Sequence, residues 1–156
     1  MKKRVIKTAF LAAVIAFAIL LSACISESDL SAAEKLEKII LEFALDDIGT
    51  VYTDNADAMH CLSDEMLSSM FALGGNVTAF GHVKSRAAYF DKSFSGGEII
   101  VFEMMDVSRT EEITSMFSRR AKRQENSLVI CRGRYVYLIC RENANVIVDY
   151  IKKSGL

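Results

Sequence analysis

His60 and Cys61 are the residues whose types could carry out covalent chemistry. A thiol beside an imidazole forms the nucleophile and base of a thiol hydrolase, provided that the two side chains meet in space. These residues are neighbours in sequence, and adjacent side chains seldom point at each other. No asparagine or aspartate that could orient the imidazole follows at a recognised spacing. A hydrolase that uses His60 and Cys61 therefore stays an alternative, and we predict no catalytic residue.

Soft metal ligands cluster in the same segment. Met59, His60 and Cys61 precede Met66 and Met70, and sulfur and imidazole ligands suit copper. However, methionines four residues apart on a helix are far more often core residues. A metal-binding protein is therefore a second alternative, and neither a metal site nor a cofactor is predicted.

Besides Cys24, which is discussed below, three cysteines occupy positions 61, 131 and 140. If the last two strands form a hairpin with Cys131 opposite Arg134, Cys140 lies six residues further along, about 20 Å away. A disulfide needs a Cα separation of about 4.4 to 6.8 Å, so Cys131 and Cys140 are predicted not to bond to each other. We expect both to be small apolar residues of the sheet, while a bond from Cys61 to either one stays open.

A basic run lies in the last turns of a predicted helix. Cations there interact favourably with the helix dipole, each contributing about 0.3–1 kcal/mol. The alternative is contact with anionic lipid head groups or wall polymers, and two arginines at a hairpin tip could extend that patch. The residues concerned are Arg119, Arg120, Lys122, Arg123, Arg132 and Arg134.

The paired carboxylates and paired glycines carry no catalytic signature. Asp46-Asp47 and Glu111-Glu112 are adjacent, so on helices the two side chains of each pair point about 100° apart. General acid–base catalysis needs converging groups instead. Gly74-Gly75 and Gly96-Gly97 lack the Gly-Lys-Ser/Thr of a phosphate-binding loop and are predicted to be turns.

Capping signals and apolar spacing predict the helices. Serine and glutamate three residues apart form capping boxes at Ser31/Glu34 and Ser108/Glu111. Apolar residues follow each box at helical spacing. The predicted helices are 32–46, a short segment from Ser63 to Gly74-Gly75, the segment opened by Ser108, and 143–153, the last burying Val146, Ile147, Tyr150 and Ile151.

Four strands are predicted in two hairpins. Residues 86–92 and 98–105 are joined by Ser95-Gly96-Gly97, and residues 128–131 and 134–140 by the turn Arg132-Gly133. Both faces of the second hairpin are apolar, so we expect the later helices on one face and the N-terminal helix, or a partner subunit, on the other. The fold class is α+β: a four-stranded, mainly antiparallel sheet in β-β-α-β-β-α order, preceded by two helices.

The amino terminus has the pattern of a secretory signal. Four basic residues precede an apolar run over 9–21, whose length of about 20 Å as a helix is short of the hydrocarbon core of about 30 Å, which leaves a single-span protein as the alternative. Leu21-Ser22-Ala23-Cys24 resembles the lipobox of bacterial lipoproteins, in which the cysteine receives diacylglycerol and the signal is cut just before it. We predict a signal peptide over 1–23, a lipidated tether over 24–31 and a single α+β domain over 32–156.

The charge of the chain after residue 23 argues against one class of partner. Fifteen basic and twenty acidic residues lie there, a formal charge of −5. Nucleic-acid-binding domains are usually basic, so nucleic acid is not an expected partner.

Several segments together resemble a known family. The lipobox, the helix start Leu62-Ser63-Asp64-Glu65, the strand 98–102, a basic helix and the segment 133–138 follow one another in this order. The chain resembles a family of small lipoproteins from Gram-positive anaerobes, catalogued as a domain of unknown function (number 4358), most firmly over about 85–150. The segment between Lys122 and Leu128 contains fewer residues here than is typical of that family. The resemblance implies a location at the membrane and no particular activity.

The main interpretation is a lipoprotein on the extracytoplasmic face of the cell membrane, held there by diacylglyceryl on Cys24. Its domain is expected to be a non-catalytic module that binds an envelope protein or a small ligand. A cell-envelope hydrolase using His60 and Cys61, and a metal-binding lipoprotein, are the alternatives.

Overall fold

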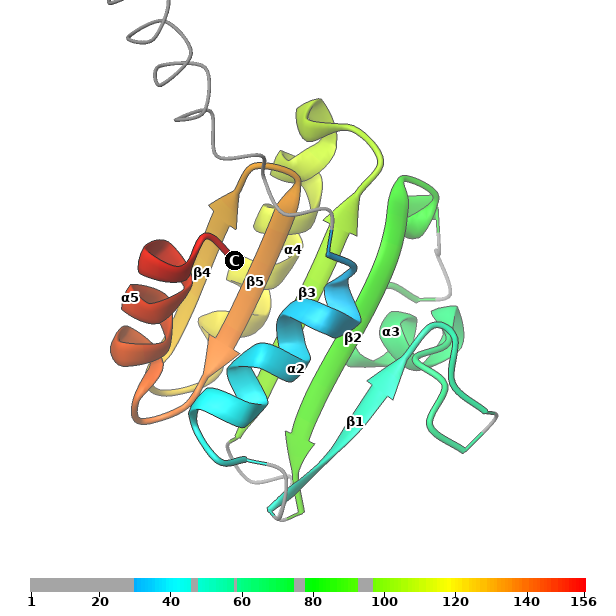
Figure 1. The fold of residues 1–156 in the computed structure, drawn as a ribbon. Helices are drawn as coiled ribbons and strands as arrows, with labels where there is room; N and C mark the ends of the chain where they lie inside the picture. Colours follow the sequence, from blue (N-terminus) through cyan, green and yellow to red (C-terminus); the bar gives the residue numbers. More distant parts are fainter. Residues whose placement is uncertain (1–29, 46–47, 58, 75–77, 93–96) are drawn as a thin grey trace, which may run out of the picture.

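A computed structural model describes residues 30–45, 48–57, 59–74, 78–92 and 97–156. In it, a five-stranded antiparallel sheet, ordered β1-β2-β3-β5-β4, lies between two layers of helices (Figure 1). The strands are β1 (Gly49–Thr53), β2 (Val83–Asp91), β3 (Glu98–Met104), β4 (Ser127–Arg132) and β5 (Tyr135–Cys140). The helices are α2 (Ala32–Glu42), α3 (Asp64–Met70), α4 (Thr110–Ala121) and α5 (Ala144–Ser154), with 3-10 turns η1 (Thr78–Phe80) and η2 (Val107–Arg109).

Both faces of the sheet are buried, as the apolar pattern of the last hairpin predicted. Odd-numbered residues of β3 and β5, such as Val101 and Tyr137, pack beneath α2 and α5. Even-numbered residues, such as Phe102 and Leu138, pack beneath α3 and α4 on the other face (Figure 1). The α+β class is therefore confirmed.

The number of strands and the distribution of helices differ from the sequence-based prediction. The sheet has a fifth strand, β1, which pairs with β2 at one edge. The later helices do not share a face, because α4 lies with α3 and α5 lies with α2. The physical reason is that α2 contacts β2 and β3, so that face still needs a helix over β4 and β5, which α5 supplies.

The β4–β5 hairpin has a different register from the predicted one. Arg132 pairs with Tyr135, so the two-residue turn is Gly133-Arg134, with Gly133 at a φ of +55°. Cys131 therefore lies opposite Val136. It is four residues along the strands from Cys140, or about 13 Å, which still prevents a disulfide.

The ends of the helices follow some of the capping signals. The box at Ser31 is confirmed, since the Ser31 hydroxyl accepts from the Glu34 N–H and the Glu34 carboxylate accepts from the Ser31 N–H at 2.7 Å. The second box is wrong: the Asp106 carboxylate caps η2 by accepting from the Ser108 N–H at 2.8 Å. The N-cap of α4, Arg109, makes no side-chain capping bond.

Two further details of the helices were predicted incorrectly. The first helix ends at Glu42 rather than at residue 46, and Ala44 takes a left-handed φ of +48°. In α5, Val146 is 59% exposed and Val148 is buried in its place, because the apolar stripe is shifted around the helix. Ile147 and Ile151 are buried, as predicted, whereas Tyr150 is only partly buried.

The Glu34 cap predicts a pH-dependent contribution to stability. Hydrogen bonds from Ser31, first its backbone N–H, lower the pKa of the Glu34 carboxyl. A lowered folded-state pKa means that this contribution is present above the unfolded-state pKa and is lost as the pH falls through the folded-state pKa. We expect Glu34→Gln to lower the melting temperature slightly near neutral pH, with the difference vanishing in strong acid. Thermal unfolding of both proteins across this pH range measures it, and a pH-independent difference would contradict it.

Candidate functional site

Two buried carboxylates lie at opposite ends of the central strand β3. Glu98 is 4% exposed and Glu103 is 2% exposed. Glu98 faces α4, where it meets Arg120, and Glu103 lies on the other face, near the first turn of α2. Neither residue was predicted from the sequence to be functional, although charged residues at both ends of an apolar strand can indicate buried charges.

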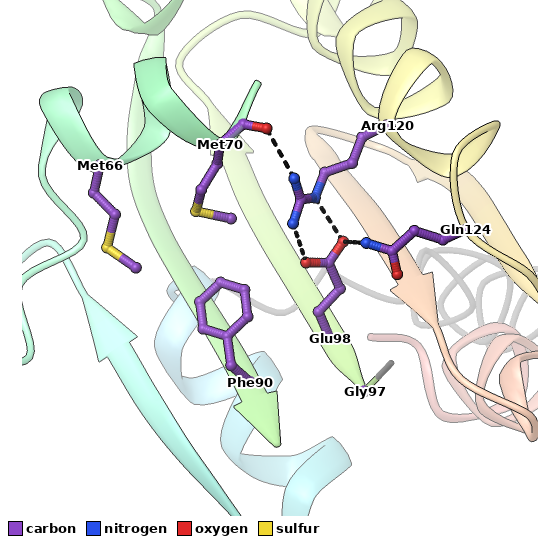
Figure 2. A pocket seen from close by; sticks show the side chains of 7 residues that line it. All are labelled: Met66, Met70, Phe90, Gly97, Glu98, Arg120 and Gln124. Atoms are coloured by element: carbon purple, nitrogen blue, oxygen red, sulfur yellow. Dashed lines mark hydrogen bonds and ion pairs between the residues drawn. The ribbon is translucent and has the colours of Figure 1, made fainter. Parts of the chain in front are cut away.

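The Glu98 carboxylate forms a two-pronged ion pair with Arg120 of α4. Arg120 Nε donates to Oε1 at 2.7 Å and Nη2 donates to Oε2 at 2.6 Å. Gln124 Nε2 donates to the same Oε1 at 3.2 Å, and Arg120 Nη1 donates to the carbonyl of Met70 at 2.8 Å (Figure 2). The pair therefore ties β3, α4 and the end of α3 together.

Two groups that contact Glu98, the Arg120 guanidinium and the Cys140 thiol, both have raised pKa values. The hydrogen bonds to Glu98 are the largest factor that raises the pKa of Arg120, so the guanidinium stays protonated. The Cys140 thiol donates to Glu98 Oε1 at 3.3 Å. Burial raises the pKa of Cys140 to about 12, so this thiol is a weak donor and not a nucleophile.

Cys140 is therefore expected to resist alkylation in the folded protein. With a pKa of about 12, only about one molecule in ten thousand carries a thiolate at a pH of about 8. The exposed Cys131 serves as the internal control and should react readily with iodoacetamide. Mass spectrometry of peptides labelled before and after denaturation tests this, and rapid labelling of Cys140 in the folded protein would contradict it.

Two adjoining pockets lie between the ends of α3 and α4. The first, of about 150 Å³, is lined by the Glu98–Arg120 pair and by Met66, Met70, Phe90, Gly97 and Gln124 (Figure 2). The second, of about 190 Å³, has an apolar wall that includes Phe71 and Met116 and a basic wall of Arg119, Arg120 and Arg123. Small-molecule sites are usually about 300–1,000 Å³. These pockets are smaller and suit single side chains of a partner.

The six basic residues singled out from the sequence do not form one surface. Arg119, Lys122 and Arg123 are exposed at the end of α4, whereas Arg120 is bound to Glu98. Arg132 and Arg134 lie at the opposite end of the sheet, five rungs from Glu98, which is about 17 Å. There, Arg132 Nη1 donates to the Lys152 carbonyl at 2.7 Å, and Arg134 Nη1 is 3.8 Å from Glu103 Oε1.

His60 and Cys61 are positioned by different contacts. The His60 ring lies 3.3 Å from Asp57 Oδ1 and tilts against Tyr52, while Cys61 forms a β-bridge with Thr53. All three cysteines in the described part of the chain are free thiols. Cys140 is buried in the sheet as expected, whereas Cys131 is exposed.

The methionines considered as copper ligands lie in different surroundings. Met59 is exposed, whereas Met66 and Met70 line the first pocket. Within the described ranges, no three histidine, cysteine, aspartate or glutamate side chains gather in a way that could hold a metal ion.

The predicted signal peptide and Cys24 lie outside the described residues. Among the residues described, no helix is long and apolar enough to cross a bilayer. Comparison of the chain with family models, with curated proteins and with solved structures finds no match.

Proposed function

We propose that this protein is a membrane-anchored extracytoplasmic lipoprotein whose domain is a non-catalytic module that binds an acidic segment of another envelope protein. The anchor part of the proposal rests on the lipobox Leu21-Ser22-Ala23-Cys24 behind a basic and apolar signal. Two acyl chains on Cys24 would hold the protein at the bilayer, since each buried methylene contributes about 0.8 kcal/mol. The resemblance to small lipoproteins of Gram-positive anaerobes is part of the same proposal.

The observation that carries the binding part is the basic pocket at the end of α4. Arg119 and Arg123 present exposed guanidinium groups beside an apolar wall that includes Phe71 and Met116. The charge of Arg120 between them is already balanced by Glu98. A partner side chain with a carboxylate and an apolar neighbour would satisfy both walls, because arginine binds carboxylates through paired hydrogen bonds.

Site-specific crosslinking in cells tests the proposal. A photoreactive amino acid at position 123 should capture one reproducible protein, whereas the same amino acid at the exposed position 149 of α5 should not. Reversing a charge with Arg119→Glu should abolish the crosslink, as should Cys24→Ala, which removes the anchor. Equal capture from positions 123 and 149, or capture that survives Arg119→Glu, would contradict binding at this pocket.

The location is tested separately by the mass of the membrane-extracted protein. A lipoprotein should begin at Cys24 and carry diacylglycerol there, and globomycin, which blocks signal cleavage of lipoproteins, should cause the precursor to accumulate. A mature chain without lipid would contradict the anchor while leaving the pocket open to test.

A further inference from the structure

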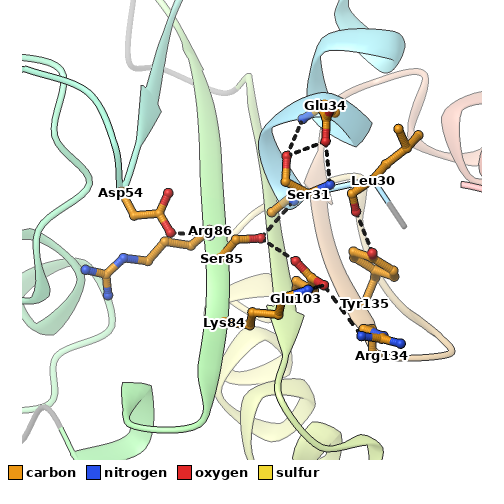
Figure 3. A network of polar contacts seen from close by, with 11 residues as sticks. Leu30, Ser31, Glu34, Asp54, Lys84, Ser85, Arg86, Glu103, Arg134 and Tyr135 are labelled. Atoms are coloured by element: carbon orange, nitrogen blue, oxygen red, sulfur yellow. Dashed lines mark hydrogen bonds and ion pairs between the residues drawn. The ribbon is translucent and has the colours of Figure 1, made fainter. Parts of the chain in front are cut away.

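The chain enters the domain at the end of the sheet that carries Glu103. Tyr135 donates its hydroxyl to the carbonyl of Leu30, and the Ala32 N–H donates to Ser85 Oγ at 2.9 Å. Ser85 Oγ in turn donates to Glu103 Oε2 at 2.7 Å (Figure 3). We call this part of the molecule the entry end: Leu30, the β3–α4 connection from Met105 to Arg109, and the β4–β5 turn.

Apolar side chains are exposed at the entry end. Met105 is 63% exposed and Val107 is 56% exposed, and both belong to the connection that leads from β3 through η2 into α4. Large apolar side chains that project from a turn cost free energy in water and gain it in a lipid interface. Figure 1 shows this connection at the same end of the sheet as the start of α2.

Basic side chains also lie at the entry end. Lys84 Nζ lies 2.8 Å from Glu103 Oε1 and Arg134 Nη1 lies 3.8 Å from it, so two cations share one buried carboxylate (Figure 3). Arg109 is exposed in η2. The bond from Arg132 to the Lys152 carbonyl brings the end of α5, with the exposed Lys152 and Lys153, to the same end of the molecule.

Acidic residues are also present at the entry end. Asp106 is bound to the Ser108 N–H and Glu34 to Ser31, so each is held in a cap. Glu111 and Glu112 lie in the first turn of α4. With Glu103, these carboxylates make five acidic side chains at the entry end, against six basic ones: Lys84, Arg109, Arg132, Arg134, Lys152 and Lys153.

The length of chain before Leu30 limits where the anchor can lie. Cys24 and Leu30 are six residues apart, a stretch of chain that can span at most about 22 Å when fully extended. A lipid on Cys24 therefore keeps Leu30 near the head groups. The end of α4 that carries Arg119 and Arg123 lies at the other end of the sheet, about 17 Å further along the strands.

From these placements we infer that the entry end is a membrane-docking surface that rests on the phospholipid head groups. Met105 and Val107 insert between the head groups, while Lys84, Arg109 and Arg134 contact the phosphates. This inference rests on the proposed lipidation of Cys24. Docking through the entry end places the basic pocket at the end of α4 on the side away from the bilayer. A partner protein can reach the pocket there.

The exposed Cys131 provides a natural reporter, because it lies beside the β4–β5 turn with its thiol 3.7 Å from the Gly133 carbonyl. Lipidated Cys61→Ser protein, purified from membranes, is labelled with a fluorophore at Cys131 and placed in vesicles of phosphatidylcholine and phosphatidylglycerol that contain a head-group nitroxide lipid. The control carries Cys61→Ser, Cys131→Ser and Lys122→Cys and is labelled at the end of α4. The fluorophore at Cys131 should be quenched several-fold more strongly than that at position 122.

The apolar contacts are tested by substitution of exposed residues, which should leave the melting temperature unchanged. Met105→Ser with Val107→Ser should reduce quenching at Cys131. Val146→Ser, which changes an equally exposed valine on α5, should not.

The outcomes separate the two proposals. Equal quenching at positions 131 and 122, or stronger quenching at 122, would overturn the docking surface in a protein whose mass still shows lipid on Cys24. A protein without that lipid would overturn the anchor, and the docking surface with it.

Discussion

Arg120→Met is expected to destabilise the domain by about 3 kcal/mol, at the lower end of what breaking a buried ion pair costs. The variant leaves the Glu98 carboxylate buried with only Gln124 and the Cys140 thiol as partners. The lower end applies because the Arg120 side chain is 22% exposed, so water can partly solvate the remaining charge. Urea unfolding at equilibrium, compared with the unchanged protein, measures the difference.

Two control variants make this result specific to the ion pair. Arg119→Met removes a neighbouring exposed guanidinium and should change the free energy of unfolding by no more than about 0.5 kcal/mol. Adding Glu98→Gln to Arg120→Met removes the unpaired charge and should restore part of the lost stability. If Arg120→Met and Arg119→Met unfolded at the same urea concentration, the pair would not stabilise the fold.

Phe102→Ala is expected to cost about 3–5 kcal/mol, the usual range when a fully buried phenylalanine is truncated. Phe102 is completely buried on β3, and its ring centroid lies 5.0 Å from that of Phe117 and 6.1 Å from that of Phe80. Phe117 stacks in turn on Phe71. The loss would therefore loosen α4 and the end of α3, which both contribute to the lining of the two pockets.

Leu41→Ala serves as the matched control for the core substitution, because Leu41 is a large apolar residue that is 66% exposed on α2. Its effect on the unfolding midpoint should be close to zero, because surface substitutions usually change stability by no more than about 0.5 kcal/mol. A Phe102→Ala protein as stable as Leu41→Ala would mean that the aromatic cluster contributes little to the free energy of unfolding.

The elements with strong local signals were predicted well from the sequence. The start of α2 is encoded by one reciprocal cap, Ser31 with Glu34, and both of its hydrogen bonds form. The strand β5 and the segment 99–102 of β3 are continuous apolar runs whose two faces are both buried. These patterns depend on residues close together in sequence, which is why they can be interpreted without knowledge of the fold.

The edge strand β1 depends on a contact that no local pattern reveals. It is short and only partly buried, and it forms by pairing with β2, some forty residues later. Its first residue, Gly49, lies under the ring of Tyr89, where an added Cβ would be 2.2 Å from Tyr89 Cζ. The requirement for glycine therefore comes from packing between distant segments.

The candidate site was missed for a related reason. Glu98 and Arg120 are 22 residues apart, and they meet only because α4 packs on the even-numbered face of β3. The sequence offered no basis for choosing that face, since both faces of the strand are apolar. Arg120 was grouped with its basic neighbours, although its charge is used inside the fold.

The two glutamates of β3 have a consequence for the accuracy of folding. Between them, Ile99, Ile100, Val101 and Phe102 are all fully buried, so hydrophobicity alone would accept the strand shifted by one residue. Such a shift would turn Glu98 away from Arg120 and Glu103 away from Lys84, leaving each carboxylate in the apolar core of the wrong face. The penalty for two unpaired buried charges makes the shifted pairing far less stable. The carboxylates thus select the native strand alignment against a close competitor that the apolar residues cannot distinguish.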